Sequence, residues 1–121
     1  MSIEKQFASI FDGLKAAYGT YKVDSKKLNG KSTGKAGVIR EPRTQELWEG
    51  HLSGKGISIG IIPINEENNC RWGCVDVDVY NLDHKALLAR IRKLKLPLVV
   101  CRSKSGGAHV FLFTTEWISA K

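Results

Sequence analysis

The amino-terminal part of the chain begins with an amphipathic pattern and continues with a long polar stretch. Over residues 2–18 most apolar positions recur at intervals of three or four, which predicts a helix; they are Ile3, Phe7, Ile10, Phe11, Leu14 and Ala17. Ser2 is placed to cap this helix, and Gly19 follows its end. Residues 22–40 hold five lysines, one arginine and three glycines, which predicts a solvated basic loop.

Alternating apolar and polar segments follow. A short helix is predicted over 44–52, with Leu47 and Trp48 as its apolar contribution. The isoleucine-rich run 57–62 predicts a buried strand, and the polar run 65–69 predicts a turn. Beyond it the order is strand, helix, strand, turn, strand. The predicted elements are strands at 71–80, 98–101 and 108–113, a helix at 83–94, a turn at 102–107 and a last helix starting at Thr114 or Thr115.

This order matches the first three strands of a ferredoxin-like or RRM-like sheet. In such a sheet the third strand lies antiparallel beside the first, so we expect His109 to lie near Asp78. The fold class is therefore α+β, in a single domain of 121 residues. We expect an amino-terminal helical and strand module over 1–66 and an incomplete RRM-like β-α-β-β unit over 67–121.

Charge and cysteine content narrow the function classes. The chain has 19 Lys and Arg against 12 Asp and Glu, a net charge of +7, which favours polyanionic partners or a basic solvated surface. No apolar run approaches the roughly 18 residues that span a bilayer, so we expect no membrane association. Three cysteines favour a reducing cytoplasm over a disulfide framework. Cys74 and Cys101 lie in apolar runs and are interpreted as buried residues.

Two acidic residues alternate with valines in the strand predicted at 71–80. Alternate residues of a strand point to the same face, so Asp76 and Asp78 would lie together. Two like charges at this spacing repel and call for a compensating cation, and hard divalent ions accept one or two carboxylates. The pattern therefore favours a metal site over its alternative, an exposed face with solvated aspartates.

The turn before the last strand has donors suited to a phosphate. Ser103, Lys104, Ser105 and two glycines precede His109. Hydroxyl, ammonium and backbone N–H groups in one turn can surround a phosphate. Such residues also populate ordinary hairpins, and a histidine at a strand start is often structural, so the turn alone decides nothing.

Together these segments resemble the archaeo-eukaryotic primase superfamily, the catalytic domain of primases and primase-polymerases. Residues 72–78, Trp-Gly-Cys-Val-Asp-Val-Asp, look like its first motif, an apolar strand that ends in Asp-x-Asp. Residues 103–111, Ser-Lys-Ser-Gly-Gly-Ala-His-Val-Phe, are similar to its second motif, in which a serine-containing loop leads to a histidine. The resemblance covers 45–113 and is greatest to phage and mobile-element members.

The resemblance implies a role for each residue of these motifs. Asp76 and Asp78 would bind the catalytic metal, Mg²⁺ or Mn²⁺, and with His109 they would form the catalytic set. The implied nucleotide-binding residues are Ser103, Lys104, Ser105 and His109. The implied function is a nucleotidyltransferase of DNA replication that uses NTPs or dNTPs for template-directed primer synthesis and extension. Its partners would be a template and primer and, in a longer protein, a helicase or further domain. It would act in the cytoplasm, that of the host if phage-encoded.

The family's third motif, an acidic residue on a later strand, has no evident counterpart. Glu116 is the only acidic residue after His109, and it falls in the predicted last helix. We therefore expect an amino-terminal portion of a primase domain, with incomplete activity by itself. A non-catalytic nucleic-acid-binding module of the same fold and a metal-dependent nuclease remain as alternatives. An unpaired edge of the strand at 71–80 would be covered either by the strand at 57–62 or by the same edge of a second molecule, and we expect the homodimer.

Overall fold

A computed structural model describes residues 1–28 and 31–121, with side chains outside 25–33. The chain divides into two compact units. Unit 1 comprises Met1–Cys70 and Ser119–Lys121, and unit 2 comprises Arg71–Ile118. Among the described residues, no helix has both the length and the apolar character needed to cross a membrane.

The first helix of unit 1, α1 (Ile3–Ile10), is shorter than predicted. Ser2 caps it as expected, because the Ser2 hydroxyl accepts a hydrogen bond from the Lys5 N–H at 3.3 Å. The helix ends early because the chain turns toward a neighbouring segment at Gly13. The Leu14 N–H donates to the Ile62 carbonyl at 2.8 Å, and a Cβ on Gly13 would overlap that same carbonyl.

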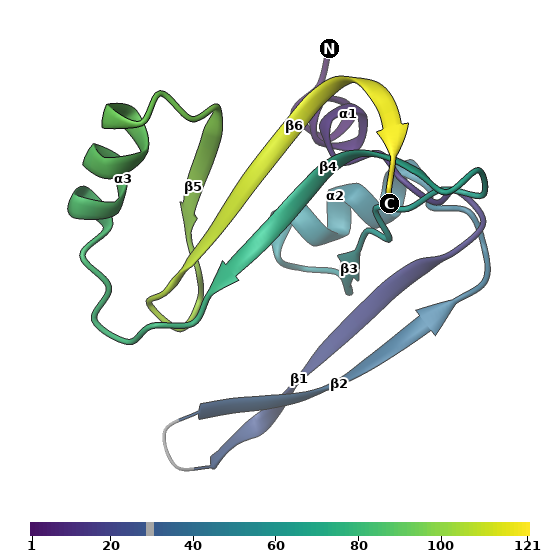
Figure 1. Ribbon diagram of the computed structural model, residues 1–121. Helices are drawn as coiled ribbons and strands as arrows, with labels where there is room; N and C mark the ends of the chain where they lie inside the picture. The colour runs from purple at the N-terminus through teal and green to yellow at the C-terminus, as the bar shows by residue number, and fades with distance from the viewer. Residues whose placement is uncertain (29–30) are drawn as a thin grey trace. The chain divides into compact units, whose positions relative to one another are not determined.

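The stretch expected to be a solvated loop is instead a β-hairpin. β1 (Tyr18–Leu28) pairs antiparallel with β2 (Lys31–Ile39), and β3 (Ser58–Gly60) pairs with the other edge of β1 (Figure 1). The loop prediction over 22–40 was wrong because backbone pairing needs no apolar side chains, and this stretch has few. Residues 29–30, inside that prediction, lie outside the described part of the chain.

The core of unit 1 joins the sheet to the second helix. α2 (Gln45–Ser53) confirms the short helix predicted over 44–52, and Thr44 is its cap, because the Thr44 hydroxyl accepts from the Leu47 N–H. The strand predicted at 57–62 is confirmed only as the three-residue β3, whose Ile59 is buried. The buried residues of this core are Tyr18, Trp48 and Ile59.

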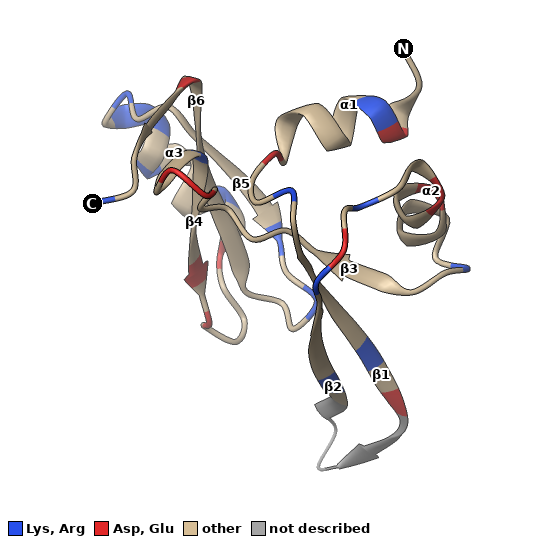
Figure 2. Cartoon of the chain, turned by 90° about the vertical axis from the view of Figure 1, so that its right-hand side faces the viewer, with Lys and Arg blue, Asp and Glu red and all other residues tan. Residues whose placement is uncertain are grey.

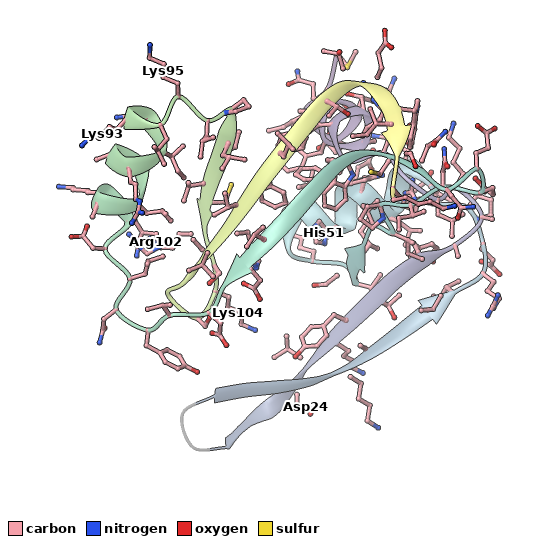
Figure 3. All side chains as sticks on the ribbon, viewed as in Figure 1. Asp24, His51, Lys93, Lys95, Arg102 and Lys104 are labelled. Carbon is pink, nitrogen blue, oxygen red and sulfur yellow. The ribbon has the colours of Figure 1, made fainter. Side chains whose placement is uncertain are left out.

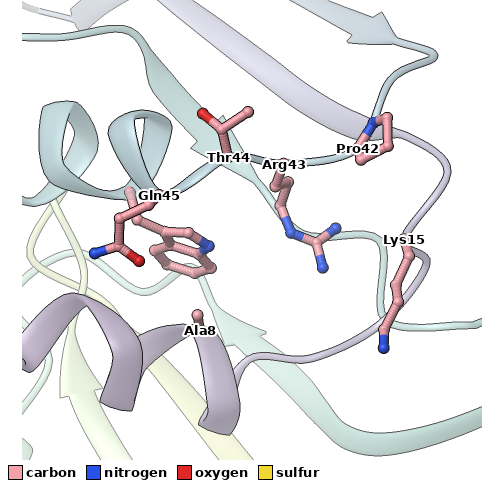
Figure 4. Close-up of a pocket in the computed structure, with 7 residues that line it drawn as sticks. Ala8, Lys15, Pro42, Arg43, Thr44 and Gln45 are labelled. Carbon is pink, nitrogen blue, oxygen red and sulfur yellow. The ribbon is translucent and has the colours of Figure 1, made fainter. Parts of the chain in front are cut away.

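A largely buried arginine side chain, 9% exposed, ties the segment before α2 to the segment before β1. Arg43 donates hydrogen bonds to the carbonyls of Leu14 and Ala17 and lies 3.9 Å from Asp12. Burial lowers the pKa of the Arg43 guanidinium, although Asp12 opposes this effect. A hollow of about 290 Å³ lies beside Arg43, and Lys15 and Trp48 also line it (Figure 4). Because the Arg43 guanidinium already has protein partners, we do not regard this hollow as a ligand-binding site.

Unit 2 has the β-α-β-β order predicted from the sequence. Its sheet has the order β4-β6-β5, formed by β4 (Asn69–Val77), β6 (Ala108–Ser119) and β5 (Leu98–Arg102). The central strand β6 runs antiparallel to both neighbours (Figure 1). α3 (His84–Lys93) is capped by Asp83 and packs on one face of the sheet, where Ile91, Ala108 and Val110 form the buried core.

Two boundaries in unit 2 differ from the prediction by three residues or more. β4 ends at Val77 rather than at Tyr80, and β6 continues to Ser119. The helix predicted from Thr114 is therefore wrong, and Glu116 lies on a strand. β6 stays extended here because it pairs with β4. The Arg71 guanidinium also donates to the Thr115 carbonyl, and the Thr114 hydroxyl lies 2.7 Å from the Glu116 carbonyl and 3.1 Å from the Arg71 carbonyl.

Candidate nucleotide site

The sheet of unit 2 has a core face and a second face that carries the candidate site. Ala108 and Val110 of β6 pack toward α3. Since successive residues of a strand point to opposite faces, His109 and Phe111 point away from α3. By the same alternation Val77 of β4 packs with the core and Asp76 points to the second face, which we call the site face.

Asp76 and His109 meet across the pair of strands β4 and β6. The Asp76 Oδ1 and His109 Nε2 atoms are 3.5 Å apart. Their side chains are 70% and 45% exposed, so both remain accessible to a ligand. The sequence pattern placed His109 near Asp78, but its contact is with Asp76. Asp78 is exposed and follows the end of β4, so it does not belong to the strand as predicted.

The loop between β5 and β6 is a tight turn held by its own hydrogen bonds. The Ser103 N–H donates to the Gly107 carbonyl at 3.0 Å, and the Gly106 N–H donates to the Ser103 carbonyl at 3.1 Å. Gly106 has a φ of +92°, a conformation that favours glycine. The hydroxyl oxygens of Ser103 and Ser105 lie 3.3 Å apart, and Lys104 between them is exposed. The turn predicted at 102–107 is confirmed.

Gly107 brings this loop into contact with the end of β4, the strand that carries Asp76. A Cβ on Gly107 would overlap the carbonyl oxygen of Val77, so only glycine permits the approach. Val77 stands between Asp76 and Asp78 in the sequence. The two motifs, 27 residues apart when counted from Asp76 to Ser103, are therefore neighbours in space.

His84, which the sequence analysis did not single out, fixes the same loop from α3. Its Nε2 atom lies 2.8 Å from the Gly107 carbonyl oxygen. Since a carbonyl only accepts, Nε2 carries the proton and donates. Gly107 thus accepts from both His84 and Ser103. The only sequence signal was a histidine directly after the helix cap, Asp83, and that position is common for structural side chains.

Aromatic rings continue the site face beyond His109. The Phe111 ring lies 6.2 Å from the His109 ring, edge to face, and 6.1 Å from the Trp72 ring. The Phe113 ring stacks on that of Phe111 at 5.7 Å. Contacts of this kind restrict ring orientation, so Phe111 helps to hold the imidazole toward Asp76.

Two thiols also occupy the site face, which corrects an expectation. Cys74 and Cys101 are exposed and form no disulfide, whereas their apolar sequence context predicted burial. The prediction was wrong because the apolar runs on β4 and β5 have only one face against α3. Cys101 lies opposite His109 in the β5–β6 register. Partial desolvation and then the negative charge of Asp76 raise the pKa of the Cys74 thiol.

The donor set suits a hard divalent cation that brings other ligands with it. Among the described residues, no cluster of three or more His, Cys, Asp or Glu side chains is placed to hold a metal ion. Mg²⁺ commonly takes only one or two protein carboxylates and completes its coordination with water and phosphate oxygens. Asp76 and Asp78 match that requirement in number and type.

Unit 2 has an RRM-like order with Asp-x-Asp and a histidine at one end of its sheet, the arrangement expected of the archaeo-eukaryotic primase superfamily, whose domains are of nucleotidyltransferase type. The family model of the archaeo-eukaryotic primase domain of TOTE conflict systems matches residues 7–121. The chain belongs to this family. Among curated proteins, no relative was found.

Proposed function

We propose that the chain binds a nucleoside triphosphate together with Mg²⁺ or Mn²⁺ and uses it in template-directed primer synthesis and extension during DNA replication. The contact between Asp76 and His109 is the observation that carries this proposal. It joins a residue of the Asp-x-Asp motif to the histidine of the second motif. The approach of Gly107 to Val77 supports it, because the loop between β5 and β6, which we expect to bind phosphate, then lies beside the same site.

The reaction would join the 3′-hydroxyl oxygen of a primer to the α-phosphorus of the incoming nucleotide, while the bond from that phosphorus to the bridging oxygen breaks and pyrophosphate leaves. The proton of the hydroxyl would pass to water. A divalent cation held by Asp76 and Asp78 would stabilise negative charge on the attacking and leaving oxygens. The two carboxylates would thereby fix the position of the α-phosphate relative to the sheet.

His109 and the loop would hold the rest of the triphosphate. The His109 Nε2 atom can donate either to Asp76 or to a phosphate oxygen, so nucleotide binding would exchange one acceptor for another. The hydroxyls of Ser103 and Ser105 and the ammonium of Lys104 supply further donors. The tight turn sets these groups before the ligand arrives, which reduces the entropy lost on binding.

Nucleotide binding by this chain tests the proposal directly. Titration calorimetry with a nucleoside triphosphate and Mn²⁺ should show saturable binding. The substitution His109→Ala should weaken it by roughly 1–3 kcal/mol, the range for losing a hydrogen bond to a charged group. The double substitution Asp76→Asn with Asp78→Asn should remove the dependence on Mn²⁺. A matched control, Glu66→Gln with Glu67→Gln, alters two exposed carboxylates in the turn before β4. It should change neither the nucleotide affinity nor its dependence on Mn²⁺.

Unchanged nucleotide affinity in a folded His109→Ala protein would contradict the proposal. Primer extension separates it from the alternatives. Incorporation of labelled nucleotides that requires Asp76 supports a nucleotidyltransferase. Degradation of a labelled strand without added nucleotides would instead indicate a nuclease, and strand binding without any nucleotide binding would indicate a non-catalytic module.

A further inference from the structure

The positive charge of the chain is concentrated in one segment of unit 2. Between residues 84 and 115 there are seven Lys and Arg and no Asp or Glu. Since the whole chain carries 19 basic and 12 acidic residues, the remaining residues hold equal numbers of each sign. The entire net charge of +7 is therefore the charge of this segment.

Most of these cations lie on the helix side of unit 2. α3 turns Leu87 and Ile91 toward the sheet and leaves its basic residues exposed. Figure 2 marks the positions of Lys and Arg along the chain in blue. On β5, Arg102 has the same parity as Leu98 and Val100, which pack toward α3. We call this set the basic face; its members are Lys85, Arg90, Arg92, Lys93, Lys95 and Arg102. Figure 3 shows Lys93 and Lys95 directed away from the sheet.

No described carboxylate neutralises the basic face. The two ion pairs among the described side chains are Arg43 with Asp12 and His109 with Asp76, neither of which includes a member of this set. Mutual repulsion among uncompensated charges disfavours the folded state. Their accumulation on one helix layer therefore indicates an anionic partner that offsets this cost.

Helix stability does not account for the basic face. Cations in the last turn of a helix interact favourably with the helix dipole. This interaction accounts for Arg90, Arg92 and Lys93, which lie in the last turn of α3. Lys85 lies in the first turn, where a cation is unfavourable. Lys95 and Arg102 lie outside the helix. Half of the set thus remains unexplained by local structure.

We propose that the basic face binds the phosphate backbone of a nucleic acid strand without reading its sequence. The inference rests on the proposed function, for which a template is the substrate, and it adds a second contact surface. Because the basic face and the site face are on opposite sides of one sheet, the strand held there is a flanking segment rather than the reacting end. Long Lys and Arg side chains without base-reading partners are typical of backbone contacts.

The salt dependence of oligonucleotide binding tests this surface. Each phosphate neutralised contributes about 0.7–0.9 to the slope of log K against log salt concentration. The combined variant K85Q, R92Q, K93Q and K95Q should therefore bind a labelled single strand more weakly and with a slope smaller by about 3. The control variant K5Q, K22Q, K35Q and K55Q removes the same charge from exposed positions in unit 1 and should change both quantities far less.

The outcomes separate this inference from the proposed function. An equal loss of oligonucleotide affinity in both variants would show that only the net charge matters and would overturn the proposal. An unchanged oligonucleotide affinity in the basic-face variant would also overturn it. The unaltered chain could instead bind anionic phospholipid vesicles through the basic face and bind no oligonucleotide. That result would overturn the proposal and would indicate a membrane surface as the partner. Nucleotide affinity measured in the same basic-face variant should equal that of the unaltered chain. If the unaltered chain binds the strand through the basic face but binds no nucleotide, the proposed function fails and this inference stands.

Discussion

At the scale of single residues, Asp76 influences two neighbours at once. Its carboxylate lies 3.5 Å from the His109 imidazole, and its charge contributes to the raised pKa of the Cys74 thiol. Both effects require the side chain to point to the site face. Cys74 is therefore a chemical reporter of the charge at Asp76.

The reporter gives a first prediction. In Asp76→Asn the negative charge is lost, so the pKa of Cys74 falls and a larger fraction of the thiol is ionised at a fixed, mildly alkaline pH. Because the thiolate is the nucleophile, alkylation of Cys74 by iodoacetamide should become faster. Mass spectrometry can follow each cysteine separately, with Cys70 as the internal reference. An unchanged rate at Cys74 would show that the Asp76 charge does not act on it.

His84 gives a second prediction, as a positioning residue. His84→Ala removes the donor to the Gly107 carbonyl, and this hydrogen bond is worth about 0.5–1.5 kcal/mol. We expect weaker nucleotide binding in a protein whose circular dichroism is unchanged. His84→Gln keeps an N–H donor of similar reach and should restore most of the affinity. If alanine and glutamine have the same effect, the hydrogen bond does not position the loop.

At the scale of elements, the loop between β5 and β6 depends on one glycine. Gly107→Ala would place a methyl group on the Val77 carbonyl, so the loop or the end of β4 must move. We expect unit 2 to lose about 1–3 kcal/mol of unfolding free energy, as in other overpacked sites. Urea denaturation measures the change. Gly73→Ala is the matched control, since nothing lies within 4 Å of its added methyl group. Equal stability of the two variants would contradict the close approach.

The sequence was sufficient for elements with a strong side-chain pattern. α3 follows from apolar residues at helical spacing after the Asp83 cap, and the three strands of unit 2 follow from their apolar runs. α2 follows from its two apolar residues, Leu47 and Trp48. It was insufficient where backbone contacts decide. The β1–β2 hairpin is held by backbone pairing between strands of largely polar residues, which give no alternating apolar pattern in the sequence. β6 extends past Thr114 because it pairs with β4, where the Thr114 hydroxyl contacts the Arg71 carbonyl.

The candidate site was partly accessible from the sequence for the same reason. The alternation around Asp76 and the strand order brought His109 to the correct end of the sheet. The partner of His109 was missed because the end of β4 depends on Gly107, whose approach to Val77 has no sequence signature other than glycine itself. The roles of all six candidate site residues, Asp76, Asp78, Ser103, Lys104, Ser105 and His109, remain predictions.

At the scale of the whole molecule, the free edge of β4 bears on assembly. The sheet order places β4 beside β6 only, among the strands of the described residues. The run at 57–62, one candidate to cover that edge, contributes β3 to the other sheet instead. A second copy of the chain, pairing edge to edge around a two-fold axis, therefore remains our expectation.

Light scattering across a concentration series tests the dimer. Val75, on β4, is 65% exposed, and a lysine at an edge discourages strand pairing. Val75→Lys should shift the mass toward the monomer at a concentration where the unaltered chain is dimeric. Val38→Lys, at a valine 64% exposed on β2, adds the same charge elsewhere and should leave the mass unchanged. A monomeric mass for the unaltered chain at the highest concentration would exclude this dimer.

The pairing of Cys101 with His109 has a consequence for how this segment can evolve. Along β6 the odd-numbered His109 belongs to the site and the even-numbered Ala108 and Val110 belong to the core. A slip of one residue would exchange the two sets, burying the imidazole and exposing the core at the same time. Substitutions in the loop would weaken the protein by degrees, whereas insertion or deletion of a single residue would abolish stability and chemistry together. Selection should therefore conserve the length of the loop as strictly as its composition.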